Sequence, residues 1–276
     1  MRRGGPWLLV APLVVLLTIL TVVPFLQLIG TSLFRSSLTA PDDTDFAAVG
    51  NYIDVVDGRD WWLAVALTLV VVTVAVAVQL LLASAFAGTL RRIKLGPWGQ
   101  VSLLVPFVLA PAAAATVWRD GWVDGFAPVW LHTEASTGQL GGLAIVLSHE
   151  VWRGTGITTV ILLAGLTQVR PSLLDSAIAD GATAWQRLTQ VVLPAVAPAV
   201  GVAALYRSLD ALRAIEAPIL AGGPLGDLTT ASQLLWNTSF SSFEVGLGAA
   251  MSVLLLVVAA GLGLLLTLLL RVRRAL

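Results

Sequence analysis

The chain has 276 residues, of which 57% are hydrophobic and only 12% are charged, and its formal net charge is zero. Soluble globular proteins are about half apolar and about a quarter charged, so this composition indicates an integral membrane protein. The neutral balance argues against a nucleic-acid partner, which would require a basic surplus. There is no cysteine, and this excludes disulfides, thiolate catalysis and cysteine-ligated metals.

Hydropathy predicts an all-α fold, a single transmembrane domain over residues 1–276 with six membrane-spanning helices. Each apolar stretch reaches the length needed to cross a bilayer, about 20 residues. We expect Pro24 to kink the first span. Pro106 and Pro111 fall inside the third, which should therefore pack within a bundle where neighbouring helices satisfy the freed carbonyls. The predicted spans are 7–33, 61–90, 98–118, 143–166, 193–220 and 245–270.

The amino-terminal apolar run follows Arg2 and Arg3, so a secretory signal peptide is an alternative interpretation. No small-residue cleavage site is obvious after the run, and it is long enough to cross the membrane. We therefore expect it to be the first span.

Loop charges predict the orientation, because basic residues gather on the cytoplasmic side of membrane proteins. On one side of the predicted spans the loops are basic, and on the other they are acidic. Both termini and the segment 171–194 are then expected in the cytoplasm. The basic residues on that side are Arg2, Arg3, Arg91, Arg92, Lys94, Arg170, Arg187, Arg271, Arg273 and Arg274.

The segment 171–194, PSLLDSAIADGATAWQRLTQVVLP, is a polar interruption between two apolar stretches. Ser172 is followed three residues later by an aspartate, and Thr183 by a glutamine. Both spacings are typical of capping boxes and predict two short helices. Gly181 lies between them and predicts a sharp turn, since glycine adopts the left-handed conformation that ends helices. An ordinary connecting hairpin would have the same pattern.

This segment resembles the EAA loop of binding-protein-dependent ABC importer permeases, in which E-A-A-x-x-D-G-A is followed at a distance by Leu-Pro. Here the loop would span 168–194, with aspartate and serine replacing the usual glutamate and first alanine. The resemblance implies two coupling helices that insert into a cleft on a cytoplasmic ATPase subunit. The positions assigned to this coupling are Asp175, Ser176, Ala177, Asp180, Gly181, Ala182, Trp185, Leu193 and Pro194.

The resemblance extends over nearly the whole chain. The Gly-Asn-Tyr at 50–52 and the Gly-Gly-Pro at 222–224 are similar to carbohydrate-type permeases. Four segments look closest to the trehalose-importing permeases of mycobacteria: SLTAPDDTDFAAVGNY, LLAGL, RSLDALR and FEVGLGAAMSVL.

The family implies a non-catalytic subunit with the type I importer permease fold in the bacterial inner membrane. It implies a second permease, a cytoplasmic ATPase dimer, an extracytoplasmic sugar-binding protein and a sugar substrate such as trehalose. Glycerol phosphate or another oligosaccharide is the alternative cargo. The chain has no GxxxxGK phosphate loop, so ATP and Mg would be bound by the ATPase.

Several ionisable residues fall inside the predicted spans, where such groups usually face a bundle interior or an aqueous path. Four of them alternate in sign at i+3 spacing along the fifth span, so neighbours can pair. One interpretation is that these pairs lock the helices together. The other is that they line a sugar path with two aromatic residues, and Asp210 is then the first candidate. The path candidates are Glu150, Trp152, Arg153, Tyr206, Arg207, Asp210, Arg213 and Glu216.

Two further patterns bear on function. His149 and Glu150 resemble the start of a zinc motif H-E-x-x-H, but Arg153 occupies the second histidine position and the other histidine, His132, lies in an outer loop, so no metal site is expected. The Gly-Gly-Pro at 222–224 begins the last outer loop, and the family resemblance implies that this loop contacts the binding protein, although its aromatics could instead be interfacial anchors. Its candidates are Gly222, Gly223, Pro224, Trp236, Asn237 and Phe240.

Two other function classes remain open. A membrane enzyme would use His149, Glu150 or Asp210, but no nucleophile and base recur at a recognisable spacing. An ion-coupled secondary transporter would use the membrane carboxylates as ion sites.

Overall fold

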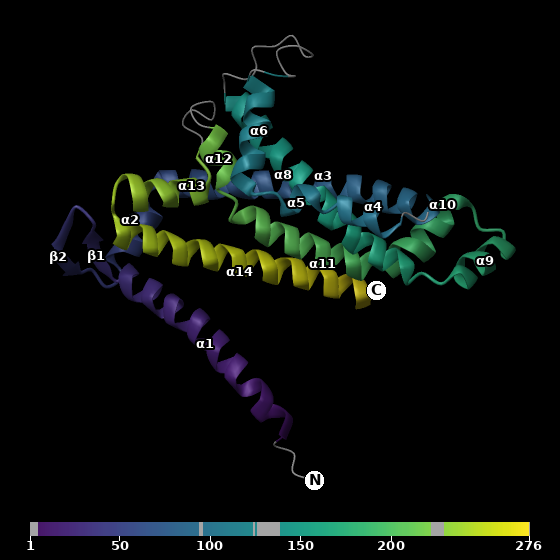
Figure 1. Ribbon diagram of the computed structural model, residues 1–276, viewed down its shortest axis with the longest axis horizontal. Helices are drawn as coiled ribbons and strands as arrows, with labels where there is room; N and C mark the ends of the chain where they lie inside the picture. Colours follow the sequence, from purple (N-terminus) through teal and green to yellow (C-terminus); the bar gives the residue numbers. More distant parts are fainter. Residues whose placement is uncertain (1–4, 94–95, 124, 126–138, 222–228, 276) are drawn as a thin grey trace. The chain divides into compact units, whose positions relative to one another are not determined.

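The computed structural model describes residues 5–93, 96–123, 125, 139–221 and 229–275, and this part of the chain is mostly helical. Figure 1 labels the elements along the chain. The chain divides into two compact units. One comprises Met1–Trp62 with Leu234–Val258, and the other Leu63–Gln233 with Ala259–Leu276.

The first unit begins with α1 (Gly5–Ser32), which includes Pro12 and Pro24 without a break in the helix. Large apolar side chains along it are more than half exposed, among them Leu13, Leu20 and Leu26. A helix satisfies its own backbone hydrogen bonds, so it can present such side chains to lipid without cost to its polar groups.

A two-stranded antiparallel ribbon follows α1, and the hydropathy pattern did not predict it. Strand β1 (Phe34–Ser37) pairs with β2 (Ala40–Phe46), with Phe34 opposite Phe46. Their rings meet edge to face at 5.3 Å between centroids. The short helix α2 (Gly50–Asp57) comes next, and the buried amide of Asn51 donates to the backbone oxygens of Ser32 (2.8 Å) and Phe34 (2.9 Å). Asn51 therefore ties the end of α1 to the ribbon.

The remaining elements in the described part of the chain are helical. The described helices after α2 are α3 (Arg59–Ile93), α4 (Pro97–Ser102), α5 (Val105–Val108), α6 (Pro111–Val123), α8 (Gln139–Thr167), α9 (Pro171–Ala179), α10 (Ala184–Gln186), α11 (Leu193–Leu212), α12 (Glu216–Ala221), α13 (Ala231–Trp236) and α14 (Val245–Ala275). Two π-helical segments, Arg187–Val192 and Asn237–Ser241, precede α11 and α14.

Four described helical stretches are long and apolar enough to cross a membrane: Val10–Ser32, Arg59–Ile93, Ala184–Ile219 and Val245–Leu270. A fifth results if α8 and α9, which meet at a 65° bend, count as one span. The predicted second, fourth and sixth spans agree closely with α3, α8 and α14.

The prediction of one continuous third helix over 98–118 is wrong, because that stretch divides into α4, α5 and α6. Pro106 lies at the start of α5 and Pro111 begins α6, with Leu109 extended between them. Proline removes a helical hydrogen bond and clashes with the carbonyl four residues earlier, so each one begins a new helix here. The predicted fifth helix is also interrupted, since α11 ends at Leu212 and α12 begins at Glu216.

Two apolar clusters hold the second unit together. One joins α3, α6, α8 and α12 through Val71, Ala115, Ile145, Val146 and Ala217. The other joins α3, α8 and α11 through Ala83, Ala87, Leu162, Val169, Val196 and Ala203. Along α3 and α8, a group of buried polar side chains lies between these two clusters.

Candidate functional site

The segment 171–194 forms two helices around a bend, as predicted (Figure 1). After the bend, α10 continues through the π-helical segment Arg187–Val192 into α11 without a break. The second half of the predicted coupling loop is therefore the first part of a helical stretch, Ala184–Ile219, that is long and apolar enough to cross a membrane. A displacement of the bend would be passed directly to α11.

The two predicted capping boxes have different outcomes. The box at Thr183 is confirmed: its hydroxyl accepts from the backbone N–H of Gln186 at 3.3 Å, and the Gln186 side chain accepts from the backbone N–H of Thr183 at 2.8 Å. The box at Ser172 is wrong. Helix α9 begins at Pro171, two residues earlier than a cap at Ser172 would allow, and its N-cap Arg170 makes no side-chain capping bond. Ser172 thus lies inside the helix, where its hydroxyl cannot cap it.

The turn at Gly181 is the one that the sequence predicts. Gly181 has φ +77°, the left-handed conformation that L side chains rarely adopt. The backbone N–H of Gly181 donates to the carbonyl of Ile178 (3.0 Å), and that of Ala182 to the carbonyl of Ala177 (2.9 Å), which is the hydrogen-bond pattern of a Schellman motif. A Cβ added at Gly181 would meet no other atom within 4 Å, so backbone conformation, and not space, requires glycine here.

The segment 171–194, the predicted coupling loop, carries apolar side chains that are more than half exposed. Leu173 is 51% exposed, Ile178 53% and Trp185 70%. Of the residues assigned to coupling, only Ala177 and Ala182 are half-buried; the exposed ones are Asp175, Ser176, Asp180, Gly181, Trp185, Leu193 and Pro194.

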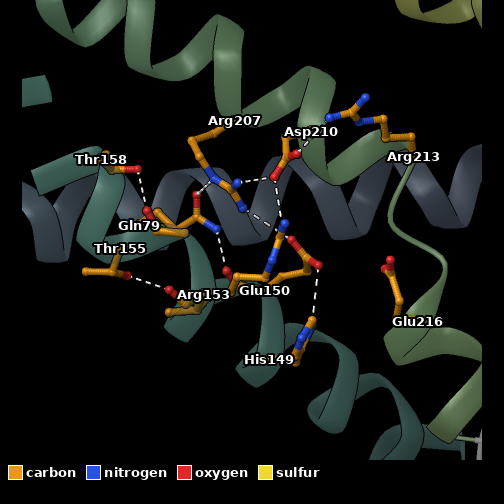
Figure 2. Close-up of polar contacts among 12 residues, drawn as sticks. Gln79, His149, Glu150, Arg153, Thr155, Thr158, Arg207, Asp210, Arg213 and Glu216 are labelled. Atoms are coloured by element: carbon orange, nitrogen blue, oxygen red, sulfur yellow. Dashed lines mark hydrogen bonds and ion pairs between the residues drawn. The ribbon is translucent and has the colours of Figure 1, made fainter. Parts of the chain in front are cut away.

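The in-membrane charges converge on one buried guanidinium, that of Arg207 in α11 (Figure 2). Its Nε donates to Oε1 of Gln79 in α3 at 3.0 Å, and its Nη2 pairs with Oε2 of Glu150 in α8 at 3.3 Å. Gln79 in turn donates to the backbone carbonyl of Glu150 at 2.7 Å. Three helices are thus joined by one polar network, and each of these three side chains is at most 1% exposed.

A glycine makes room for this network. A Cβ at Gly154 of α8 would lie 2.4 Å from Nε2 of Gln79 and 2.5 Å from both Nε and Nη2 of Arg207. Real Cβ atoms essentially never come so close to other heavy atoms. The guanidinium can therefore lie against α8 only because residue 154 has no side chain.

Asp210 lies one helical turn from Arg207 and contacts three arginines (Figure 2). Its Oδ2 pairs with Nη1 of Arg207 and, at 2.9 Å, with Nη1 of Arg153, while its Oδ1 accepts from Nη2 of Arg213 at 3.3 Å. Arg213 differs from the others because its side chain is 77% exposed. Both carboxylate oxygens are thus occupied within the chain.

Glu216 does not join the predicted i+3 ladder. It begins α12, after the break in the helix, and its carboxylate accepts only from the backbone N–H of Ile215 (3.2 Å) among the described residues. Figure 2 shows it apart from the other side chains. The i+3 spacing predicts pairing only while the helix continues, and α11 ends at Leu212.

Aromatic rings lie beside Arg153 at one side of the network. The guanidinium of Arg153 lies over the ring of Phe107, 5.1 Å from its centroid. Tyr206, 39% exposed, lies 6.3 Å from Phe107 between centroids, and Trp152 lies 6.1 Å from Trp118 edge to face. The two predicted aromatic path residues therefore lie beside other rings from α5 and α6.

His149 packs beside the network, with its Nδ1 3.5 Å from Oε1 of Glu150. Among the described residues, no group of three His, Asp or Glu side chains has the arrangement needed to hold a metal.

The predicted contact residues for a binding protein are placed only in part. Gly222, Gly223 and Pro224 lie outside the described residues. Asn237 is exposed at the start of a π-helical turn, and Trp236 and Phe240 stack at 4.4 Å between ring centroids.

Two residues on which the network depends, Gln79 and Gly154, were not among the residues predicted from the sequence. Gln79 had a visible signal, since it is the only amide side chain in the apolar helix α3. Gly154 had none, because its role depends on where the side chains of Gln79 and Arg207 lie once α3, α8 and α11 have packed.

Known transport proteins are similar to this chain along most of its length. Residues 81–274 match the family model described as the binding-protein-dependent transport system inner membrane component. The chain is 35% identical over 259 residues to the trehalose transport system permease protein SugA of Mycobacterium tuberculosis, an alignment covering 92% of this chain and 84% of that protein. It is 28% identical to the trehalose/maltose transport system permease protein MalF of Thermococcus litoralis, over 90% and 87% of the two chains.

Solved structures agree on the fold. A bacterial ABC transporter that imports the acidic polysaccharide alginate matches with a TM-score of 0.74 at 19% identity, covering 96% of this chain and 95% of that one. The family match, the identity along most of the chain and this architecture lead to one assignment. The chain belongs to the family of inner membrane components of binding-protein-dependent transport systems.

Proposed function

We propose that the chain is the transmembrane permease subunit of an ATP-driven importer whose cargo is a sugar, a disaccharide such as trehalose. The observation that carries this proposal is the exposed, capped bend at 180–183, which continues into the helix that bears Arg207. The names of the trehalose relatives support the cargo. Glycerol phosphate is the alternative cargo, because a glycerol-3-phosphate permease of Yersinia pestis is 28% identical over 93% of this chain.

The partners follow from the same proposal. A cytoplasmic ATPase dimer, which binds ATP and Mg, would receive the bend, and its exposed Trp185 and Ile178 are suited to an apolar cleft. A second permease subunit would complete the pathway. An extracytoplasmic sugar-binding protein would deliver the cargo, as a periplasmic protein bound to alginate pentasaccharide is found with the alginate transporter.

Six membrane crossings, with both termini in the cytoplasm, fit the arrangement of α3 and α8. Arg91 near the end of α3 donates to the carbonyl of Val169 just after α8 (3.1 Å), and Gln79 contacts Glu150 further back along both helices. The two helices therefore run in the same direction. If both helices cross the membrane, the chain between them would cross it once more, and we propose that α4, α5 and α6 form this broken crossing.

The network suggests how movement would spread in alternating access. Closure of the ATPase would displace the bend, and α11 would follow. Because Arg207 is bound to Gln79 and Glu150, α3 and α8 would move with α11 as one body. Bistable bundles of this kind change state by rigid-body movement.

For the sugar path, the contacts separate the candidates into two groups. Arg207, Glu150 and Asp210 are occupied by one another, which supports the interpretation that they lock the helices. Tyr206 and Trp152 lie beside Phe107 and Trp118, and we propose these two as the sugar-facing part. Arg153 joins the two groups, because it pairs with Asp210 and also lies over the ring of Phe107. Flat aromatic faces suit a pyranose ring, while the guanidinium can donate to hydroxyls.

The test compares two substitutions at Gly181 in the complex assembled with its ATPase. We expect Gly181→Val to abolish ATP-dependent uptake, because a β-branched residue strains the left-handed turn, whereas Gly181→Asn should retain most of it, since asparagine tolerates that conformation. Competition by trehalose, maltose and glycerol phosphate identifies the cargo. Normal assembly and uptake by Gly181→Val would contradict the coupling role. Uptake driven by an ion gradient without ATP would instead indicate a secondary transporter.

A further inference from the structure

The second unit has an open apolar groove at the end of the helices that leads to the coupling loop. Its volume is about 520 Å³, within the usual range of ligand pockets, roughly 300–1,000 Å³. Its walls come from α3, α8, α9 and α11, and the apolar lining includes Leu162, Leu166, Leu174, Leu188, Val192 and Val196.

Two arginines of α3, Arg91 and Arg92, are the charged groups among the described residues that line this groove, and no described carboxylate lines it. Arg91 is held in place by its bond from Nη2 to the carbonyl of Val169 (3.1 Å). Arg92 is exposed and pairs with no described residue. The groove is therefore apolar inside and cationic at one edge.

The arginines lie at the level where the apolar part of α3 ends. Arg91 and Arg92 are in the last turn of the 35-residue helix, whose preceding turns are almost entirely apolar. In a bilayer, this is the depth at which acyl chains meet headgroups. Basic pockets between membrane helices on the cytoplasmic side are suited to anionic headgroups.

We propose that this groove binds an anionic phospholipid of the inner leaflet, with an acyl chain along the leucines and its phosphate on Arg91 and Arg92. The leaflet assignment rests on the proposed orientation. Leu174 of α9 and Leu188 of the π-helical segment form the wall nearest the bend, so a bound lipid contacts both sides of the coupling loop. Occupancy of the groove would thus influence how freely the bend moves.

The experiment uses the assembled transporter in phosphatidylcholine vesicles that contain a photoactivatable probe, either phosphatidylglycerol or phosphatidylcholine with the reactive group on the acyl chain. We expect the phosphatidylglycerol probe to label peptides of α3 and α8 in preference to the phosphatidylcholine probe. Arg91→Gln and Arg92→Gln should each lower this preference about five-fold, because one basic residue near an anionic membrane surface strengthens binding by about that factor. Arg170→Gln, an exposed arginine that does not line the groove, is the matched control.

A second pair of variants tests the groove by filling it in one variant and leaving it open in the other. A Cβ at Gly88, which lines the groove, would meet nothing within 4 Å, so Gly88→Leu is expected to fold and to abolish labelling. Gly261→Leu is equally unobstructed but lies in α14 outside the groove, and it should label like the unchanged protein. Size-exclusion chromatography confirms that both assemble.

Equal labelling by the two probes would overturn the proposal. So would a loss of labelling in Gly261→Leu as large as that in Gly88→Leu. So would labelling of the isolated chain that disappears once the second permease is added, because a protein subunit would then fill the groove. Sugar uptake is measured on the same vesicles. Uptake without selective labelling contradicts only the lipid site, and selective labelling without ATP-dependent uptake contradicts only the proposed transport function.

Discussion

Arg207 is the residue on which the buried network depends. Replacing it by leucine leaves Glu150 and part of Asp210 buried without a cation. Removing one partner of a buried ion pair costs about 3–5 kcal/mol, because the remaining charge is uncompensated. We therefore expect Arg207→Leu to lower the unfolding free energy of the purified chain by about that amount, measured by denaturation in detergent micelles.

The control for this prediction lies on the same carboxylate. Arg213 also pairs with Asp210, but its side chain is 77% exposed. Exposed ion pairs contribute about 0–1 kcal/mol, so Arg213→Leu should change stability little. Equal losses in the two variants would mean that burial does not decide the strength of these pairs.

Gly154 carries a second prediction at this scale. In Gly154→Ala the new methyl group would meet Gln79 and Arg207 at 2.4–2.5 Å, so the helices must separate or the guanidinium must move. Overpacking of this kind costs about 1–3 kcal/mol. Thermal unfolding should show the loss, whereas Gly261→Ala, with open space around it, should be neutral or slightly stabilising. A neutral Gly154→Ala would show that the side chains of Gln79 and Arg207 can shift without loss of the network.

The sequence could predict only part of this network. The i+3 spacing of Arg207 and Asp210 was sufficient to predict their pairing, because both lie on one helix. The contact of Arg207 with Gln79 and Glu150 joins residues 128 and 57 positions apart. Such contacts depend on the packing of three helices, about which local patterns carry no information.

At the level of single elements, the two predicted capping boxes provide a matched pair of substitutions. Thr183→Ala removes the hydroxyl that accepts the N–H of Gln186, and loss of such a cap costs about 1 kcal/mol. We expect faster amide hydrogen exchange at 184–187. Ser172→Ala should leave exchange in α9 unchanged, because Ser172 makes no capping bond. Accelerated exchange in both variants would indicate that Ser172 caps α9 after all.

The elements differ in how far hydropathy could predict them. Long apolar helices such as α3 and α14 were found within a few residues, because lipid requires a continuous helix of that length. The predicted third span is not among the described helical stretches long enough to cross a membrane, because it divides into three pieces. Averaged hydropathy does not register the lost N–H of Pro106 and Pro111. The β1–β2 ribbon is short and polar, and Ser37 and Ala40 pair only because the chain turns back between them.

For the whole molecule, the main consequence of the structure is that the bend and the buried network belong to one mechanical unit. The bend continues into α11, and α11 is joined to α3 and α8 by the polar contacts of Arg207 with Gln79 and Glu150. A force on the segment 171–194 would therefore act through Arg207, near the end of α11, on the middle parts of α3 and α8. The strength of the network and the number of crossings are independent properties, and they can be tested separately.

The number of membrane crossings can be measured directly because the chain has no cysteine. We expect Gly96→Cys, just after α3, and Ser176→Cys, in α9, to react with an impermeant maleimide from the cytoplasmic side, and Thr39→Cys, in the ribbon turn, from the opposite side. The physical reason is that Arg91 and Val169 are in contact, so α3 and α8 end at the same membrane surface. Labelling in intact cells and in inverted vesicles distinguishes the two sides. If α4–α6 did not cross, Gly96→Cys and Ser176→Cys would react from opposite sides, and the chain would have five spans with its termini on different sides of the membrane.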